Sequence, residues 1–200
     1  MMFFKVKNML KPLALASALF MYVLPTDGQS FAVKTNLLYD ATTTINAGVE
    51  VGLSPRWTLD VSGNYNPWEF SDNRKWKHWL VQPEARWWMC NKFMGSFLGF
   101  HALGGQYNVG NIPSDFKFLG TDFGKLEDSR YQGWMLGAGV AYGYDWAVAN
   151  HFNIEFELGL GVVYSKYDQF ECPECGKKQG SGDHFYVGPT KVAISLVYVF

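Results

Sequence analysis

NIEFELGLGVVYS, residues 153–165, shows the pattern that decides the fold of this chain. Large apolar side chains occupy every second position from Ile154 to Tyr164, and Asn153, two glutamates and two glycines occupy the other phase as far as Gly161. A period of two residues is typical of a β-strand whose two faces meet different surroundings. The stretch therefore predicts one strand with a bulky apolar face and a small or charged face.

The same alternation recurs along the chain from residue 31 onward. Eight segments of strand length show it: Phe31–Asp40, Ile45–Leu53, Trp57–Asn66, Lys77–Met89, Gly95–Gln106, Tyr131–Tyr144, Asn153–Ser165 and Val187–Phe200. Glycines in Gly95–Gln106 leave it ambiguous which residues of that segment face inward. Pro83 in Lys77–Met89 lacks a backbone N–H, so we expect a bulge or weak pairing in that strand.

The connectors between these segments alternate in length. Short turns are expected near residues 54–56, 90–94 and 146–151, and long polar connectors at 66–76, 108–130 and 166–185. This arrangement is typical of transmembrane β-barrels, which have short periplasmic turns and long outer loops. We predict an all-β fold, an antiparallel transmembrane barrel of about eight strands with up-and-down topology.

The volume of the side chains on the two faces of the strands distinguishes a membrane barrel from a soluble one. An eight-stranded interior is only just wide enough for side chains, so it suits glycine, serine, asparagine and paired charges. A bulky face turned outward would expose a large apolar surface unless lipid covered it. We therefore expect outer-membrane lipid to surround the barrel, in preference to the soluble alternative.

The N-terminal residues resemble a secretory signal. Lys5, Lys7 and Lys11 precede an apolar run over residues 13–24 that is too short to span a bilayer. We expect residues 1–28 to be removed and residues 29–200 to form one outer-membrane domain; a single anchor helix is the alternative. A formal net charge of −1 leaves no basic footprint for nucleic acid.

Charged residues on the small face form the main candidate site. The inward phase carries Lys34, Glu50, Asp60, Glu84, Arg86, Glu155, Glu157 and Lys191. Buried charges need partners, so we predict a lumen charge network in which Arg86 and Lys191 meet some of the carboxylates. Acid–base catalysis by Glu155 and Glu157 and a narrow gated path for ions or water are the alternatives.

Cysteines and histidines suggest little further chemistry. Cys172 and Cys175 form a CPEC knuckle that fits a local disulfide, two free thiols or half of a zinc site, with His184 as one further ligand. No Ser–His–acid set is visible at short range, although distant strands could assemble one around His78 or His101. No P-loop, dinucleotide fingerprint or zinc-protease helix is present, so we expect no cofactor, no metal and no catalytic residues.

Four motifs carry a family resemblance: KTNLLYD (34–40), GVE (48–50), QPEAR (82–86) and GQYNVG (105–110). They resemble domain-of-unknown-function family 3575, OmpA-like small barrels of Bacteroidetes outer membranes. The resemblance implies an outer-membrane barrel, and surface or fimbrial partners contacted through the loops. It implies no catalytic residues.

The final strand resembles the signal that the barrel insertion machinery recognises in outer-membrane proteins, with Tyr198 and Phe200 at alternate positions. Together these features predict a non-enzymatic barrel with an envelope-structural or surface-interaction role. A lipid A acyl-modifying enzyme of the outer leaflet and a narrow channel are the alternatives.

Overall fold

The computed structural model describes residues 30–70, 74–110, 117–118, 121–122, 130–170 and 176–200. The predicted signal segment, residues 1–28, lies outside them, as do Cys172 and Cys175.

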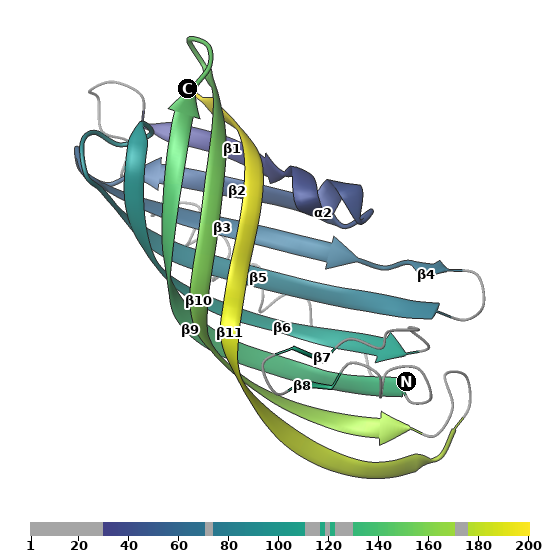
Figure 1. The fold of residues 1–200 in the computed structure, drawn as a ribbon. Helices are drawn as coiled ribbons and strands as arrows, with labels where there is room; N and C mark the ends of the chain where they lie inside the picture. Colours follow the sequence, from purple (N-terminus) through teal and green to yellow (C-terminus); the bar gives the residue numbers. More distant parts are fainter. Residues whose placement is uncertain (1–29, 71–73, 111–116, 119–120, 123–129, 171–175) are drawn as a thin grey trace, which may run out of the picture.

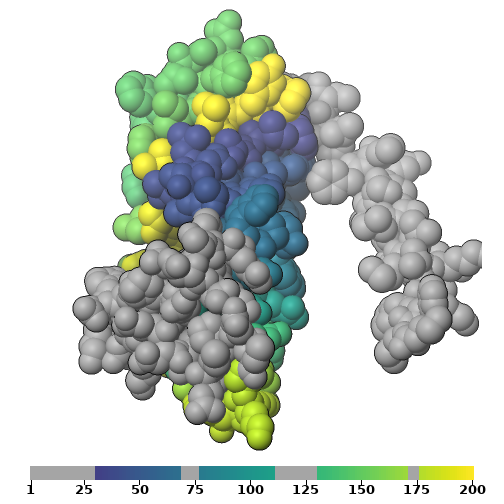
Figure 2. Space-filling model, turned by 90° about the vertical axis from the view of Figure 1, so that its right-hand side faces the viewer, coloured from purple at the N-terminus to yellow at the C-terminus, as the bar shows by residue number. Residues whose placement is uncertain are grey.

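Eight antiparallel strands are hydrogen-bonded into a ring (Figure 1). They are β1 (Phe31–Asn36), β2 (Ile45–Gly52), β3 (Trp57–Asn66), β5 (Arg74–Trp88), β6 (Gly95–Gly110), β9 (Arg130–Ala147), β10 (Phe152–Phe170) and β11 (Lys178–Val199). Each strand pairs with its neighbour in the meander, and the pairing of β1 with β11 closes the ring. Figure 2 shows this closure as the purple surface of the first strand lying against the yellow of the last. The predicted all-β class, strand number and meander order are confirmed.

Three further strands have only two residues each. The two-residue β4 (Glu69–Phe70) pairs with β5, and β7 (Lys117–Phe118) pairs with β8 (Thr121–Asp122). No helix in the described part of the chain is long and apolar enough to cross a membrane.

One end of the ring, here called the turn end, carries the short turns after β2, β5 and β9. Backbone hydrogen bonds join these turns to each other and to the last strand: Trp88 N donates to Arg56 O at 2.8 Å, and Val199 N donates to His151 O at 2.8 Å. Such bonds satisfy backbone groups that a strand end leaves unpaired. Hydrogen bonds therefore hold the turns of this end together. The opposite end of the ring is called the loop end.

The first predicted strand is too long. It ends at Asn36, and Leu37–Ala41 form a short helix, α2. The Asn36 side chain accepts from the N–H of Leu38 at 3.1 Å, and Asp40 accepts from Thr35 Oγ1 at 2.9 Å. These local side-chain bonds compete with the sheet ladder and begin a helical turn.

The predicted long connector over residues 166–185 is mostly strand. β10 continues to Phe170 and β11 begins at Lys178, with Lys166 opposite Asp183 and Phe170 opposite Lys178. The polar composition of this stretch indicated a loop, but an antiparallel ladder is made by the backbone and tolerates polar side chains on both faces in water.

Pro83 weakens pairing without a bulge. The β5–β6 ladder stops after Val81–Gly104 and resumes at Glu84–His101 with the register unchanged. A bulge does occur between β10 and β11: Gly159 pairs with Lys191, whereas Leu160 pairs with Pro189, and the same ladder has a second register shift between Gln169 and Phe170. Thr190 is thus the extra residue at the first shift, and its side chain is free to join the interior.

The ring is much taller on one side. β1, β2 and β3 have 6, 8 and 10 residues, whereas β9, β10 and β11 have 18, 19 and 22. In Figure 1 the long strands run well past the end of β1 and curve away at the loop end. The helix α2 follows the shortest strand and contacts β11, so it lies at the low side of the opening.

Candidate functional site

The interior of the ring changes character from the turn end to the loop end. An apolar layer comes first, then a cluster of charged residues, then a buried histidine, and finally an apolar cavity. Each strand contributes its alternate, inward-facing positions to these layers in the order that the registers fix.

Aromatic rings fill the turn end. Trp88 and Phe97 are fully buried, with ring centroids 4.8 Å apart, and Phe93 lies 6.2 Å from Trp88. A second buried group, Ala32, Val197 and Val199 with Phe93, packs on the facing strands. Phe97 fits because Gly143 on β9 has no Cβ, which would collide with the ring. This layer closes the turn end with apolar side chains.

Arg86 is the centre of the next layer, the charge cluster. Its Nε donates to Glu84 at 2.6 Å, and its two terminal nitrogens donate to Glu155 and Glu157 at 2.6 and 2.8 Å. Nη1 also donates to Glu50 at 2.8 Å. The guanidinium lies 4.4 Å from the centre of the Phe97 ring, so it rests on the aromatic layer as a cation on a π face.

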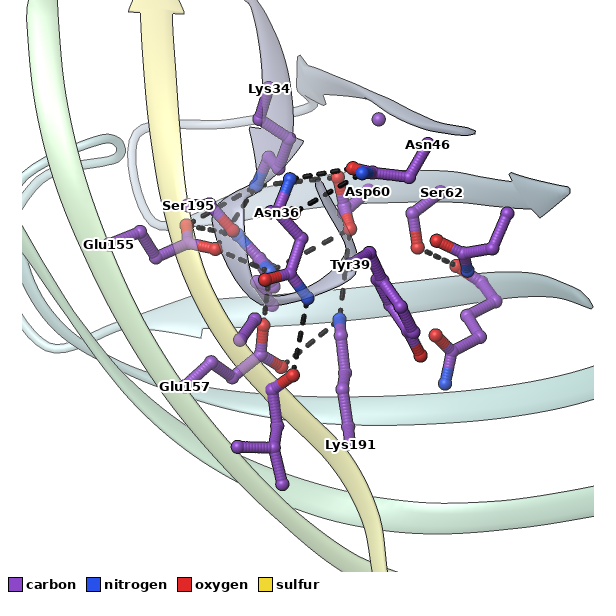
Figure 3. A pocket seen from close by; sticks show the side chains of 16 residues that line it. Lys34, Asn36, Tyr39, Asn46, Asp60, Ser62, Glu155, Glu157, Lys191 and Ser195 are labelled. Atoms are coloured by element: carbon purple, nitrogen blue, oxygen red, sulfur yellow. Dashed lines mark hydrogen bonds and ion pairs between the residues drawn. The ribbon is translucent and has the colours of Figure 1, made fainter. Parts of the chain in front are cut away.

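Two lysines complete the charge cluster. Lys34 on β1 binds Glu50 at 2.5 Å and Glu155 at 3.2 Å. Lys191 on β11 binds Glu84 at 2.9 Å and Glu157 at 3.1 Å. Figure 3 shows the two ammonium groups approaching the carboxylates from above and below. The structure brings all eight predicted network residues into one set of ion pairs: Lys34, Glu50, Asp60, Glu84, Arg86, Glu155, Glu157 and Lys191.

The charge cluster is almost completely shielded from solvent. Each of its eight residues is at most 9% exposed. Five carboxylates face three cations, so the fully ionised cluster carries a formal charge of −2. Burial of so many charges is tolerable only with dense pairing, since each isolated ion would lose several kcal/mol of hydration.

A small cavity of about 30 Å³ lies beside the charge cluster and has room for about two water molecules. Its lining includes Tyr39, which would share the outward face of Phe31 and Val33 if the strand predicted over Phe31–Asp40 continued through it. Because α2 turns the backbone at Asn36, Tyr39 is carried over the ring and lines the interior, as Figure 3 shows. The strand predicted over Phe31–Asp40 is therefore wrong at Tyr39, which lines the interior.

His101 lies on the loop-end side of the charge cluster. Its Nε2 is 2.8 Å from Thr190 Oγ1, and its Nδ1 is 3.6 Å from Glu84 Oε2. The ring fits between Gly139 and Gly159, where a Cβ would come within 2.8 Å of it. A hydroxyl, an imidazole and a carboxylate thus stand in a row, but the last distance is too long for a hydrogen bond. Glu84 is also held by Arg86 and Lys191, so the arrangement fits a structural role.

Beyond His101 the interior opens into a cavity of about 300 Å³, here called the outer chamber. Its wall is made by Leu80, Leu103, Met135, Val163, Tyr186 and Pro189, with Thr190 at its floor and Tyr107, Ser165 and His184 toward the loop end. Tyr107 Oη and Ser165 Oγ are 3.1 Å apart. A wider cavity of about 710 Å³, which shares Tyr107, lies at the loop end.

Sequence reasoning missed the outer chamber. It treated the inner face as uniformly small or charged, and it left the phase of the fifth segment ambiguous. The registers place Phe97, His101 and Leu103 inward and Leu98 and Phe100 outward. One signal was present: Leu103, Met135 and Val163 interrupt the small or polar phase of their strands near the loop end.

The remaining predicted site residues lie apart from this interior. Tyr198 contacts Phe152 and Phe200 at centroid distances of 5.0 and 4.7 Å at the turn end. Cys90 is an exposed free cysteine in the turn after β5. Among the described residues, no group of three histidine, cysteine or acidic side chains could hold a metal ion.

Comparison with known proteins identifies a family but no individual protein or solved structure that matches. No curated protein matches the chain, and no solved structure matches it. The motifs around residues 34–50, 82–86 and 105–110 resembled one family, and its model matches residues 14–200. The chain therefore belongs to the family described as "Protein of unknown function (DUF3575)".

Proposed function

We propose that this protein is an exported outer-membrane β-barrel without enzymatic activity, with an envelope-structural or surface-interaction role. One observation carries the proposal: the distribution of polarity is inverted relative to a water-soluble protein. Arg86 and Glu155 are completely buried, whereas Leu136 on the outer face of the ring is 61% exposed. Large apolar side chains in water would form an aggregation-prone surface, and a bilayer removes that cost.

Aromatic residues on the outer face support the membrane location. One row across neighbouring strands contains Trp57 and Trp87, which pair directly. A second row contains the pair Tyr65–Trp79, and Trp134 follows two strands on, through Gln106. Trp57 and Tyr65 are eight residues apart on β3, about 27 Å along the strand. A strand tilt of about 35–45° shortens this separation to about 19–22 Å along the membrane normal, slightly less than the apolar band of about 25 Å between the aromatic girdles of such barrels.

The filled interior favours a closed barrel and argues against a conducting channel. Trp88 and Phe97 fill the turn end, and the ion pairs of Arg86 connect β2, β3, β5 and β10 directly above them. A conducting path would have to open both layers. A structural role for the charge cluster is accordingly preferred to acid–base chemistry at Glu155 and Glu157.

The tall side of the ring supports a surface role. A tilted strand needs only about 9–11 residues to cross a bilayer, and β9, β10 and β11 have up to twice that number. The excess would extend from the membrane at the loop end, together with the connectors. We propose that this extension contacts surface or fimbrial partners, and that the turn end faces the periplasm.

Cell fractionation combined with protease treatment of intact cells tests location and orientation together. The proposal predicts recovery with the outer membrane and cleavage within residues 108–130 in intact cells. Recovery in a soluble fraction, or cleavage confined to the turn end, would contradict it. Mass spectrometry of lipid A from a deletion strain tests the enzymatic alternative, because an unchanged acyl pattern is expected here.

A further inference from the structure

We propose that the outer chamber is a binding site for one single-chain amphiphile, such as a fatty acid or a fatty-acyl ester. The apolar tail lies among Leu80, Leu103 and Met135, and the polar end lies at Tyr107 and Ser165. The inference needs the closed ring and its cavity, and it goes beyond the structural role proposed above.

The first argument is the chemistry of the wall. Leucine, methionine, valine and proline side chains line most of the cavity. Met135 and Val163 are only half-buried, so an apolar occupant would remove their exposed surface from water. A cavity of about 300 Å³ therefore favours a hydrocarbon occupant over water.

The second argument is the position of the polar groups, which fixes the orientation of the ligand. At the floor, His101 and Thr190 already bond to each other at 2.8 Å, and a Glu84 carboxylate oxygen lies 3.6 Å from His101 Nδ1. That floor repels an anionic end group. Toward the loop end, the Tyr107 and Ser165 hydroxyls can donate to a carboxylate or carbonyl oxygen. The tail consequently points inward.

The third argument is size. About 300 Å³ is at the lower limit of small-ligand sites, which suits one slender chain and excludes a two-chain phospholipid. Glycines at inward positions of β9 and β10 keep the chamber from being filled by the protein itself. Gly137, for example, would carry a Cβ 2.9 Å from Val163.

Site-resolved photolabelling in phospholipid vesicles tests the inference. The probe is dodecanoic acid with a diazirine at its tail end, and labelled residues are mapped by peptide mass spectrometry. We expect labels inside the ring at Leu80, Leu103 or Met135, in addition to labels from the bilayer on outward residues such as Leu136. Labels on outward residues alone would overturn the proposal.

A matched pair of variants on β10 gives the control. Val163 lines the chamber and Val162 faces outward, so Val163→Phe should reduce interior labelling at least tenfold while Val162→Phe leaves it unchanged. Labelling of Leu136 should be the same in both. Interior labelling that survives Val163→Phe in a folded barrel would contradict the site.

Two further variants keep the test decisive if Val163→Phe fails to fold, as judged by heat-dependent gel mobility. Ser165→Phe obstructs the chamber from its loop-end side and should have the same effect. Tyr107→Phe removes one hydrogen bond to the polar end and should weaken probe binding about 2- to 10-fold without blocking it. Unchanged binding in both variants would refute the proposed position of the ligand.

Discussion

The two halves of the interior differ in how fully side chains fill the space inside the ring. Near the turn end, the space inside the ring is filled by Arg86, its carboxylate partners and the rings of Trp88 and Phe97. Toward the loop end, β5, β6, β9, β10 and β11 line an open cavity of about 300 Å³ with mostly apolar side chains. Near the turn end, side chains meet across the ring and fill it; toward the loop end, the side chains of the wall leave a cavity between them.

From this difference we expect the packed half, near the turn end, to stabilise the barrel and the outer chamber to bind the proposed ligand. Substitutions in the packed half should destabilise the barrel, because each residue there has several partners that would be left buried and unpaired. Substitutions in the outer chamber should cost less, because its side chains already lack atoms on one side. The following variants test this contrast, from the largest expected effect to the smallest.

Arg86→Ala should have the largest effect. It leaves Glu84, Glu155 and Glu157 buried without their common cation, and removal of one partner from a buried ion pair typically costs about 3–5 kcal/mol. Urea unfolding followed by gel mobility measures the loss. Arg56→Ala, at an exposed turn position, is the control and should unfold as the wild type does. Equal midpoints for the two variants would show that the charge cluster does not stabilise the ring.

Gly143→Val should destabilise the barrel by about 1–3 kcal/mol, the usual cost of overpacking. The new side chain would collide with the Phe97 ring and displace it from Trp88 and Arg86. Gly63→Val is a close control, since a Cβ there meets nothing within 4 Å. The same unfolding assay compares them, and a larger loss for Gly63→Val would contradict the packed aromatic layer.

Leu103→Ala should cost less than the ~2–5 kcal/mol of a leucine-to-alanine change in a closed core. Leu103 is buried but faces the outer chamber, so its truncation enlarges an existing cavity. Denaturant midpoints of Leu103→Ala and Phe97→Ala provide the comparison, with Phe97→Ala expected to be the less stable. The reverse order would mean that the chamber is the better packed half.

Lys178→Ala should leave the unfolding midpoint unchanged but alter a local titration. Hydrogen bonds from Lys178 and Ser181 lower the pKa of Asp168, which lies in the part of β10 beyond the proposed membrane span. Loss of the ammonium group should raise the pKa of Asp168 toward its ordinary value, as measured by NMR titration. Lys177→Ala is the control and should leave that pKa as it is.

The alternation of residues predicted the ring and the residues of its charge cluster, because a period of two assigns side chains to faces without any tertiary information. Arg86, Glu155 and Lys191 could be placed inward in this way, although which atoms pair could not. That depends on the shear between strands and on the bulge at Thr190, and neither follows from the alternation alone.

The errors occur where side chains bond locally or where polarity is a poor guide. Asn36 and Asp40 form a helical turn in place of strand, which carries Tyr39 inward. Residues 166–170 and 178–185 continue as paired strand although their composition is that of a loop. The outer chamber is a volume between several strands, so no single stretch of sequence describes it.

The most direct test of the central claim is the accessibility of spin labels along β10 in lipid vesicles. Single labels at residues 154 to 163 are compared for relaxation by oxygen, which concentrates in the bilayer, and by a water-soluble nickel chelate. For an outer-membrane barrel we expect a period of two, with oxygen access highest at 154, 156, 158, 160 and 162 and low at the positions between them. High access of the nickel chelate at the outward positions would show that the bulky face meets water, and would contradict an outer-membrane barrel.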